Sequence, residues 1–471
     1  MPGVKMKTSN IVNETVINDT IKRNSGNDLR KFDEIIQKSL KMSGISFEEV
    51  AFLLNVTDEN LINKLTAAAV KVKEAIYGKR IVLFAPLYTS SYCSNECKYC
   101  GFKTTLGISR KRLTNDEIKR DTEALINMGH KRILMVAAED PLLSASTLAG
   151  QIETIYSIKH LNGQIRRVNV NVAPMSVEDF RILKRAGIGT YQCFQETYHR
   201  DTYSEMHLRG SKSDYDNRIH VFDRCIEAGI DDFGMGFLFG LYDVKFEVLA
   251  LLQHVKFLED RFGIGPHTIS IPRLESAEGS DISKVSPFLV NDTDFIKITA
   301  ILRLAVPYTG IILSTRENQV MRNRLLDVGV SQLSAGSITN PGGYSEEKSS
   351  KVKELDGAQF EVHDQRSLDE MIYHACLSGF IPSFCTGCYR KGRTGEVFQD
   401  MAKEKHIGSY CSMNAILTLQ EYVEDYASPQ TRKAAEKTIS EQLSVLEENE
   451  NKKSLIEKLS RIKSGQRDLM Y

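Results

Sequence analysis

The stretch of sequence that decides the fold of this chain is an apolar run followed closely by a cysteine-rich loop, Ile81-Val82-Leu83-Phe84-Ala85 and then Cys93-Ser94-Asn95-Glu96-Cys97-Lys98-Tyr99-Cys100. The apolar run predicts a buried strand, and the loop after it carries three cysteines in a C-x3-C-x2-C spacing. Four-iron clusters are normally held by four cysteine thiolates, so this loop would leave one iron open for another molecule. Zinc usually needs four protein ligands, and no histidine lies between Thr89 and Gly101. The spacing therefore favours an iron–sulfur cluster over zinc.

The composition indicates an ordinary globular protein without a strong overall field. Hydrophobic residues make up 41% of the chain, and Lys+Arg and Asp+Glu balance at 61 each. This balance argues against nucleic acid or an anionic membrane as a partner. No apolar run reaches the roughly 18 residues that a membrane span needs. Residues 1–27 lack both the apolar core of a secretion signal and the arginine bias of a transit peptide. We therefore expect a cytoplasmic protein, where clustered cysteines more often bind metal than form disulfides.

Residues 79–338 alternate short apolar runs with helical stretches. The strand candidates are Ile81–Ala85, Arg132–Ala137, Arg167–Val172, Thr190–Phe194, Asp232–Leu238, Thr268–Pro272, Gly310–Ser314 and Gln332–Ala335. Apolar strands that alternate with helices indicate parallel pairing, and eight of them match a TIM-type (β/α)8 barrel. An open, doubly wound sheet remains the alternative, because the pattern alone does not show closure.

The segments on either side of the barrel are predicted to be mostly helical. Residues 1–78 form an N-terminal helical extension, which includes a capping box at Ser46-x-x-Glu49. Residues 339–471 form a C-terminal domain that carries a second cysteine set, Cys385-Thr-Gly-Cys388 and, 22 residues further, Cys411. On spacing alone this set suits zinc or a cluster about equally, and His374 or His406 could complete a zinc site.

The first cysteine loop, with Tyr99 before its last cysteine, resembles the signature of the radical S-adenosylmethionine (SAM) enzymes. In that family the open iron of a [4Fe–4S] cluster held by residues such as Cys93, Cys97 and Cys100 binds the methionine part of SAM. The resemblance implies a radical SAM barrel and a SAM site at the carboxyl ends of the strands, the face where barrel active sites lie.

Several residues at the later strand ends match positions of this family. Glu139 ends Val136-Ala-Ala-Glu139, a partial match to the Gly-Gly-Glu motif that receives the methionine amino group. Glu196 would contact the ribose hydroxyls or the SAM amine, and Arg218 would pair with the SAM carboxylate. Gly236 and Gly240 lie at the two ends of a segment that resembles the adenine-contacting strand. Without the resemblance, each of these side chains would more often be a structural residue.

Within the family, the chain resembles the aromatic-amino-acid lyases, and among them the branch that serves [FeFe]-hydrogenase maturation. That branch has a C-terminal C-x2-C-x22-C motif, which the related tyrosine lyase of thiazole synthesis lacks, and Cys385, Cys388 and Cys411 match it. The resemblance implies cleavage of L-tyrosine to p-cresol and dehydroglycine, and conversion of dehydroglycine to carbon monoxide and cyanide at a second [4Fe–4S] cluster. That cluster would carry an additional iron bound through free L-cysteine and a histidine, and His267 matches the histidine position. Without the resemblance, His267 would be interpreted as a core histidine.

The carboxylate of a tyrosine substrate needs a cation, and Arg316 at the end of the seventh strand is the best-placed guanidinium for a bidentate contact. Ser334 and Ser337 could assist it, while Arg322 and Arg324 remain alternatives to Arg316. The partners implied are a reduced electron donor and other hydrogenase maturation proteins. Two other functions stay open: tyrosine cleavage to 2-iminoacetate for thiazole synthesis, and a zinc-ribbon barrel that acts as a binding module.

Overall fold

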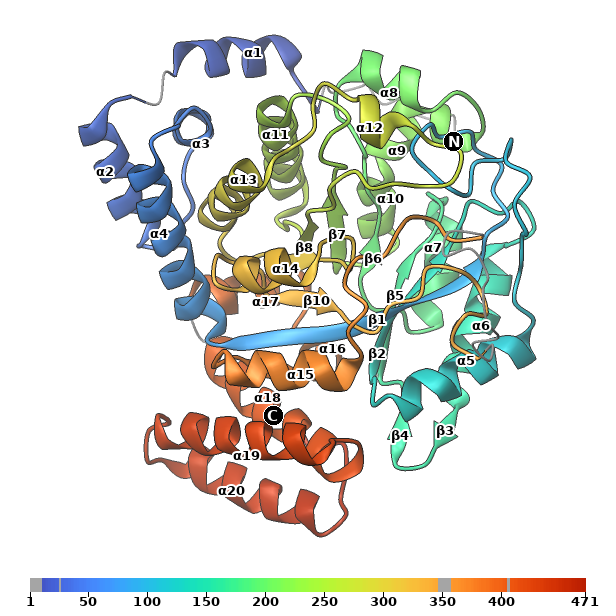
Figure 1. Cartoon of the computed structure of the whole chain (residues 1–471), viewed down its shortest axis with the longest axis vertical. Coiled ribbons are helices and arrows are strands. Elements are labelled where there is room, and N and C mark those ends of the chain that lie inside the picture. The colour runs from blue at the N-terminus through green and yellow to red at the C-terminus, as the bar shows by residue number, and fades with distance from the viewer. Residues whose placement is uncertain (1–10, 25–26, 346–356, 405–406) are drawn as a thin grey trace.

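The computed structural model describes residues 11–24, 27–345, 357–404 and 407–471, and within them eight parallel strands close into a barrel (Figure 1). These strands are β1 (Arg80–Ser90), β2 (Arg132–Ala137), β5 (Arg167–Asn171), β6 (Tyr191–Gln192), β7 (Phe233–Gly236), β8 (Thr268–Ser270), β9 (Gly310–Leu313) and β10 (Gln332–Ser334). Each pairs with the next, and β10 pairs with β1 to close the ring. The predicted (β/α)8 barrel is therefore confirmed, and the open-sheet alternative is wrong.

Strand β1 is long enough to make three pairings along its length. Its first half pairs with β10, with Val82 opposite Gln332, and its second half pairs with β2, with Ala85 opposite Ile133. Its first residues also pair with β11 (Ile381–Ser383), which comes from the C-terminal part of the chain. The first cysteine loop therefore follows the carboxyl end of β1, and the second cysteine set begins beside its amino end.

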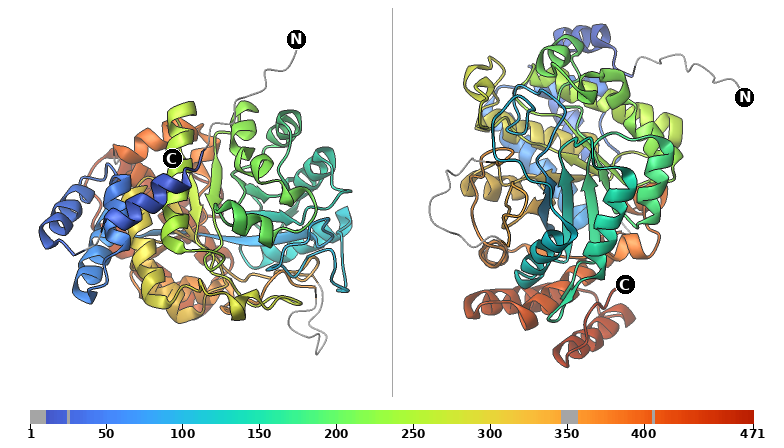
Figure 2. Two further views of the ribbon diagram at one scale, coloured as in Figure 1. Left: turned by 90° about the horizontal axis from the view of Figure 1, so that it is seen from above. Right: turned by 90° about the vertical axis from the view of Figure 1, so that its right-hand side faces the viewer.

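Helices surround the barrel on its outer side (Figure 2). They are α5 (Asn115–Asn127), α6 (Ala145–Ser157), α7 (Val177–Arg185), α8 (Arg200–Met206), α9 (Tyr215–Ile219), α10 (Val221–Glu227), α11 (Val244–Phe262), α12 (Ile282–Val285), α13 (Asp292–Ala305) and α14 (Gln319–Leu326). A 3-10 turn, η1 (Ser211–Ser213), and a small hairpin of β3 (Lys159–His160) and β4 (Gly163–Gln164) complete this part. Helix α5 begins at a capping box in which Thr114 and Glu117 satisfy each other's backbone N–H groups.

The flanking segments are helical, as predicted. Helices α1 (Glu14–Arg23), α2 (Leu29–Ser39), α3 (Phe47–Leu54) and α4 (Glu59–Tyr77) precede the barrel, and the capping box at Ser46 and Glu49 is present. Helices α15 (Leu368–Leu377), α16 (Gly387–Arg390), α17 (Gly395–Lys403), α18 (Ile407–Asp425), α19 (Pro429–Ser444) and α20 (Glu450–Lys463) follow it. Strand β11 lies beyond residue 338 but pairs with the barrel strand β1. The domain boundaries at residues 78 and 338 therefore stay a prediction.

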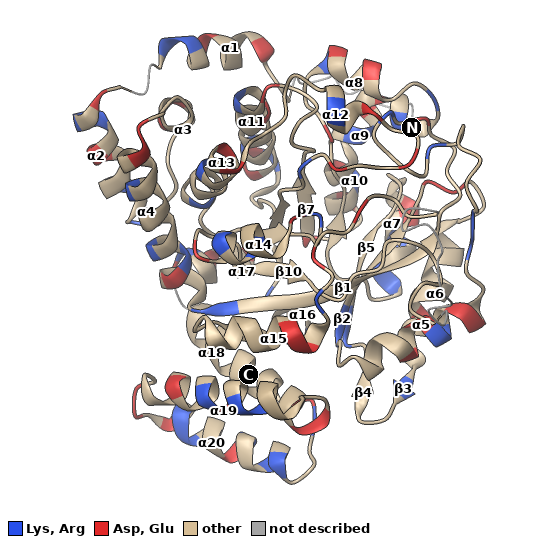
Figure 3. Cartoon of the chain, in the orientation of Figure 1, with Lys and Arg blue, Asp and Glu red and all other residues tan. Residues whose placement is uncertain are grey.

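Charged residues of both signs are interspersed over the elements of the fold (Figure 3). This distribution agrees with the balanced composition. Among the described residues, no helix combines the length and the apolar character that crossing a bilayer requires.

The buried amine of Lys73 on α4 predicts that the stability of the protein depends on pH and is lower at low pH than at high pH. Its Nζ atom lies 4.7 Å from the centre of the Phe380 ring and has no hydrogen-bond partner among the described residues. Burial lowers the pKa of Lys73 to about 7. Above pH 7 the unfolded chain therefore holds this proton more tightly than the folded chain, so this group makes stability rise with pH toward its ordinary pKa.

Replacing Lys73 by methionine should therefore raise the free energy of unfolding by about 1–3 kcal/mol at pH 7. The gain should shrink as the pH approaches 10, because the penalty in the natural protein then fades. Thermal unfolding of both proteins at pH 6.5, 8 and 10 measures this. A gain that does not change with pH, or a loss, would contradict the explanation.

Candidate active site and second metal centre

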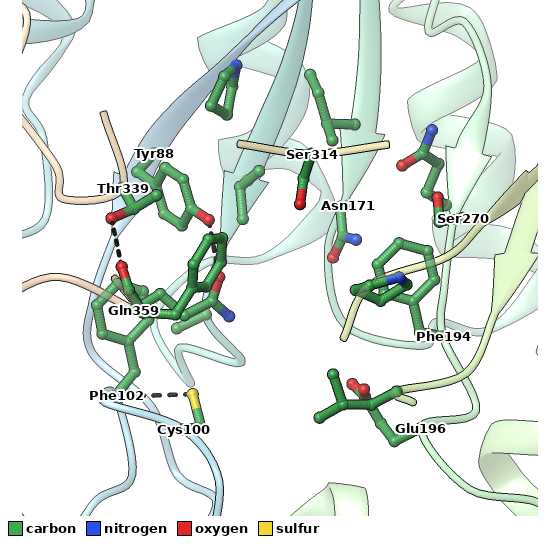
Figure 4. A pocket seen from close by; sticks show the side chains of 18 of the residues that line it. Tyr88, Cys100, Phe102, Asn171, Phe194, Glu196, Ser270, Ser314, Thr339 and Gln359 are labelled. Carbon is green, nitrogen blue, oxygen red and sulfur yellow. Dashed lines mark hydrogen bonds between the residues drawn. The ribbon is translucent and has the colours of Figure 1, made fainter. Parts of the chain in front are cut away.

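The carboxyl ends of the barrel strands surround a cavity of about 1430 Å³, its open mouth included. Its walls come from the first cysteine loop, from the ends of the strands and from the segment around Gln359 and Phe360. Figure 4 shows Asn171, Ser270, Ser314 and Glu196 around this space, with the sulfur of Cys100 at its edge. The cavity therefore brings the cysteine loop and the ends of the barrel strands together around one space.

All three cysteines of the first loop line this cavity. Cys97 is buried, and Cys93 and Cys100 are half-buried. The backbone N–H of Phe102 donates to the Cys100 sulfur at 3.4 Å, and the N–H of Asn95 donates to the Cys93 sulfur at 3.5 Å. Burial raises the pKa of Cys97 to about 12, so the bare thiol stays protonated and needs a bound metal to become a thiolate.

Two of the predicted SAM ligands, Glu139 and Glu196, lie beside two cations in a nearly buried group. Glu139 contacts Arg218 at 3.0 Å, and Glu196 contacts Lys212 at 2.6 Å and Arg218 at 3.9 Å. Burial opposes ionisation, but Arg218 and Lys212 outweigh it and lower the pKa of Glu139, and they do the same for Glu196. The group is therefore held as two carboxylates and two cations, with balanced charge.

The sequence interpretation missed Lys212. It lies in η1, and its backbone N–H donates to the side chain of Asn95 in the cysteine loop at 3.0 Å. Lys212 thus links two parts of the site: the cysteine loop, which would hold the cluster, and the carboxylate of Glu196. No spacing or motif distinguishes Lys212 from the many surface lysines of the chain, so only the tertiary structure shows this contact.

The structure separates the three arginine candidates for the substrate carboxylate. Arg316 lines the cavity and stacks on Phe360, with its guanidinium 3.5 Å from the ring centre, and it has no carboxylate partner among the described residues. Arg322 is buried away from the cavity, where it pairs with Asp364. Arg324 is exposed on α14. Arg316 alone of the three is therefore free to bind an anion in the cavity.

The two predicted serines also line this cavity. The Oγ atoms of Ser334 and Ser337 are buried and have no hydrogen-bond partner among the described residues. A buried hydroxyl without a partner loses free energy, so both are suited to a ligand that supplies one. They lie in and just after β10, close along the sheet to the end of β9 that carries Arg316.

The two glycines predicted near the adenine have packing reasons to be glycine. A Cβ atom at Gly236 would come within 2.6 Å of the Ser270 carbonyl oxygen, and Gly240 has a positive φ of +111°. Neither lines the cavity, whereas Leu238 between them does. Leu238 is therefore the residue of this segment that is placed to contact a ligand.

The second cysteine set lines a separate, smaller cavity at the amino ends of the strands. Cys385, Cys388 and Cys411 lie there together with His267, which precedes β8. The backbone N–H of Gly387 donates to the Cys385 sulfur at 3.2 Å, and Arg132 donates to the Cys385 carbonyl at 2.6 Å. The cavity therefore gathers three thiols and one imidazole from segments far apart in the sequence.

His267 has the properties of a metal ligand with a carboxylate nearby. Burial lowers its pKa, which favours the neutral imidazole that binds metals. Its Nδ1 atom lies 3.4 Å from the Asp232 carboxylate but makes no hydrogen bond to it; a carboxylate in hydrogen-bond contact is what orients metal-binding histidines in other proteins. Of the two zinc-ligand alternatives, His374 is not among the lining residues of this cavity, and His406 lies outside the described residues.

No three Cys, His, Asp or Glu side chains in the described part of the chain converge closely enough to hold a single metal ion. Cysteines of an iron–sulfur cluster each bind a different iron, so they need not converge on one point. Buried and half-buried thiols, with backbone N–H groups that donate to a sulfur in each set, suit such a cluster in both cavities.

The closed barrel and its cysteine loop define a radical SAM protein. Residues 87–255 match the family model of the Radical SAM superfamily, and residues 270–381 match that of the Biotin and Thiamin Synthesis associated domain. This class uses a [4Fe–4S] cluster and SAM.

The particular family follows from solved structures. The chain is 46% identical to HydG, a maturase of the [FeFe]-hydrogenase, with 98% of this chain and 100% of that chain covered and a TM-score of 0.94. HydG from Carboxydothermus hydrogenoformans is 38% identical, with 95% and 98% covered and a TM-score of 0.80. The chain belongs to the HydG family of [FeFe]-hydrogenase maturases.

More distant relatives share the barrel. The 2-iminoacetate synthase of Escherichia coli (strain K12) is 29% identical over 351 residues, which are 74% of this chain and 89% of that protein. Methylornithine synthase is 19% identical, with 74% of this chain and 97% of that chain covered and a TM-score of 0.59, which shows the fold alone.

Proposed function

We propose that this protein cleaves the Cα–Cβ bond of L-tyrosine to p-cresol and dehydroglycine, and converts dehydroglycine to carbon monoxide and cyanide on iron for assembly of the hydrogenase H-cluster. One observation carries the proposal: two three-cysteine sets line separate cavities at opposite ends of β1. Membership of the HydG family supports the link to hydrogenase maturation.

In the first cavity, Cys93, Cys97 and Cys100 would hold a [4Fe–4S] cluster with one open iron. When bound, the cluster and SAM supply a one-electron cleavage that yields methionine and a 5′-deoxyadenosyl radical. The chain's own part is to orient SAM: Glu139 and Glu196 would accept from its amino and ribose hydroxyl groups, and the balanced ion pairs would hold both carboxylates ionised.

For the substrate, Arg316 would bind the tyrosine carboxylate, with Ser334 and Ser337 as hydrogen-bond donors. These contacts with the carboxylate would direct the amino group of tyrosine toward SAM. Loss of a hydrogen atom from that nitrogen would then lead to cleavage of the Cα–Cβ bond. The p-hydroxybenzyl radical then takes one electron and one proton from a reduced donor and becomes p-cresol. The other fragment is dehydroglycine, whose atoms balance as carbon monoxide, hydrogen cyanide and water.

In the second cavity, Cys385, Cys388 and Cys411 would hold a second [4Fe–4S] cluster. His267, which lies beside Asp232, would bind the additional iron together with free L-cysteine. Other hydrogenase maturation proteins would receive the product, and a reduced electron donor would supply the electrons. We infer a cytoplasmic location from the reduced cysteines that this chemistry needs.

Anaerobic incubation of the reconstituted protein with SAM, L-tyrosine and dithionite tests the proposal. We expect p-cresol, carbon monoxide and cyanide, with iron and sulfide for two clusters. Formation of p-cresol without carbon monoxide would leave only the 2-iminoacetate-type lyase, a reaction supported by the E. coli relative. A reconstituted protein that holds only zinc would contradict both lyases and favour a binding module.

A further inference from the structure

Glu196, whose carboxylate lies among the buried charges of the first cavity, has an unusual backbone conformation. Its φ is +68°, in the left-handed region that non-glycine residues rarely adopt. The Thr197 N–H donates across it to the Gln195 carbonyl at 2.9 Å, which makes a three-residue turn of a rare and strained kind. Such a conformation persists only where the surroundings impose it.

The residues before the turn are held by the neighbouring strand. The Gln195 N–H donates to the Gly236 carbonyl at 3.0 Å, and the Leu238 N–H donates to the Glu196 carbonyl at 2.8 Å. The first bond continues the barrel pairing of β6 with β7 and determines where the chain enters the turn, and the second holds the peptide group that follows Glu196.

The residues after the turn are held by α11 through a carboxyl group that has no other role in the site. Glu247 is 1% exposed. Its side chain accepts hydrogen bonds from the Thr197 hydroxyl and, at 2.8 Å, from the Tyr198 N–H. Two turns further along the same face of α11, His254 contacts the Tyr198 hydroxyl at 3.1 Å. Helix α11 thus binds the two residues that follow Glu196.

We propose that Glu247 is a positioning residue for SAM: by holding Thr197 and Tyr198 against α11, it keeps Glu196 in the left-handed turn that directs its carboxylate into the SAM cavity. This inference rests on the proposed SAM site. Without Glu247, Thr197 and Tyr198 lose two of the hydrogen bonds that hold the exit of the turn, and Glu196 can relax toward an ordinary conformation with its carboxylate displaced from Lys212 and Arg218.

The test is the affinity for SAM of the full-length, anaerobically reconstituted protein, measured by equilibrium dialysis without tyrosine. Glu247→Ala should weaken SAM binding about tenfold, as expected for release of strain of this kind. Glu247→Gln should stay within about threefold of the natural protein, because its amide can meet both partners. Burial raises the pKa of Glu247 to about 8, so the neutral amide also resembles its main state at pH 7.

A double-mutant cycle separates positioning from general stability. In a Glu196→Ala background, Glu247→Ala should cause no further loss of SAM affinity, because the positioned carboxylate is already absent. Equal losses in both backgrounds, or unchanged affinity in the single Glu247→Ala variant, would overturn the inference. If Glu247→Ala fails to fold, Thr197→Val removes one of the two contacts and should weaken SAM binding about threefold in the natural background only.

A matched control lies on the same helix. Glu259 of α11 accepts from the Tyr308 hydroxyl at 2.7 Å and does not line the first cavity. Glu259→Ala should leave SAM affinity unchanged, and an equal loss there would overturn the inference. Failure of the natural protein to bind SAM would instead overturn the proposed function, which distinguishes the two results.

Discussion

Replacing Cys388 by serine is expected to abolish carbon monoxide and cyanide formation, by more than about 100-fold, while p-cresol formation stays within a few-fold of the natural protein. Cys388 belongs to the cavity at the amino ends of the strands, and the residues proposed for SAM and tyrosine lie at the carboxyl ends. A serine hydroxyl is a poor ligand for cluster iron, so the second cluster should be lost without disturbing the first cavity.

The measurement is the ratio of the three products in single incubations, together with iron and sulfide content. Cys376→Ser is the matched control, because Cys376 is also a buried cysteine of the C-terminal part but lines neither cavity. It should keep all three products. A Cys388→Ser protein that still made both diatomic products would contradict the role of the second set, and equal loss of p-cresol would contradict the separation of the two cavities.

Replacing Arg316 by methionine is expected to raise the KM for L-tyrosine about 100-fold or more, with little effect on SAM affinity. A bidentate contact between a guanidinium and a carboxylate is among the strongest polar contacts that a site can offer. Because Arg316 has no carboxylate partner among the described residues, its removal leaves no buried anion unpaired. The melting temperature should therefore change little.

Two other arginines make this prediction specific. Arg324→Met changes an exposed residue of α14 and should leave the KM unchanged. Arg322→Met should instead lower the melting temperature, because Arg322 pairs with Asp364 and donates to the Ser334 carbonyl inside the protein. A normal KM in Arg316→Met, or an increase as large in Arg324→Met, would show that the tyrosine carboxylate binds elsewhere.

Much of the fold was predictable because barrel strands have a local pattern. Each of the eight apolar runs contains or overlaps an observed strand, and the capping box at Ser46 lies where the sequence placed it. Strand ends were less predictable: the expected run Thr190–Phe194 yields only Tyr191–Gln192 as β6. The reason is that a strand ends where its neighbours stop pairing, which is a property of the whole sheet.

The candidate site was predictable only where its residues share a motif. Glu139, Glu196 and Arg218 were proposed from a resemblance, and the structure brings all three together with Lys212. Lys212 and Glu247 have no motif, because each acts through a partner remote in the sequence. Their roles and the ligand roles of the other residues stay predictions for the experiments above.

The sequence by itself determined the class of chemistry. Cys93, Cys97 and Cys100 lie in one short loop, so no distant contact is needed to bring their three thiols together. The second set at Cys385, Cys388 and Cys411 likewise indicated the branch of the family. Only the tertiary structure decided that these sets lie at opposite ends of β1, because that depends on β11 pairing with the start of a strand some 300 residues earlier in the chain. Closure of the barrel, which is a long-range interaction, forms the first cavity and decides that Arg316 is the candidate arginine that lines it.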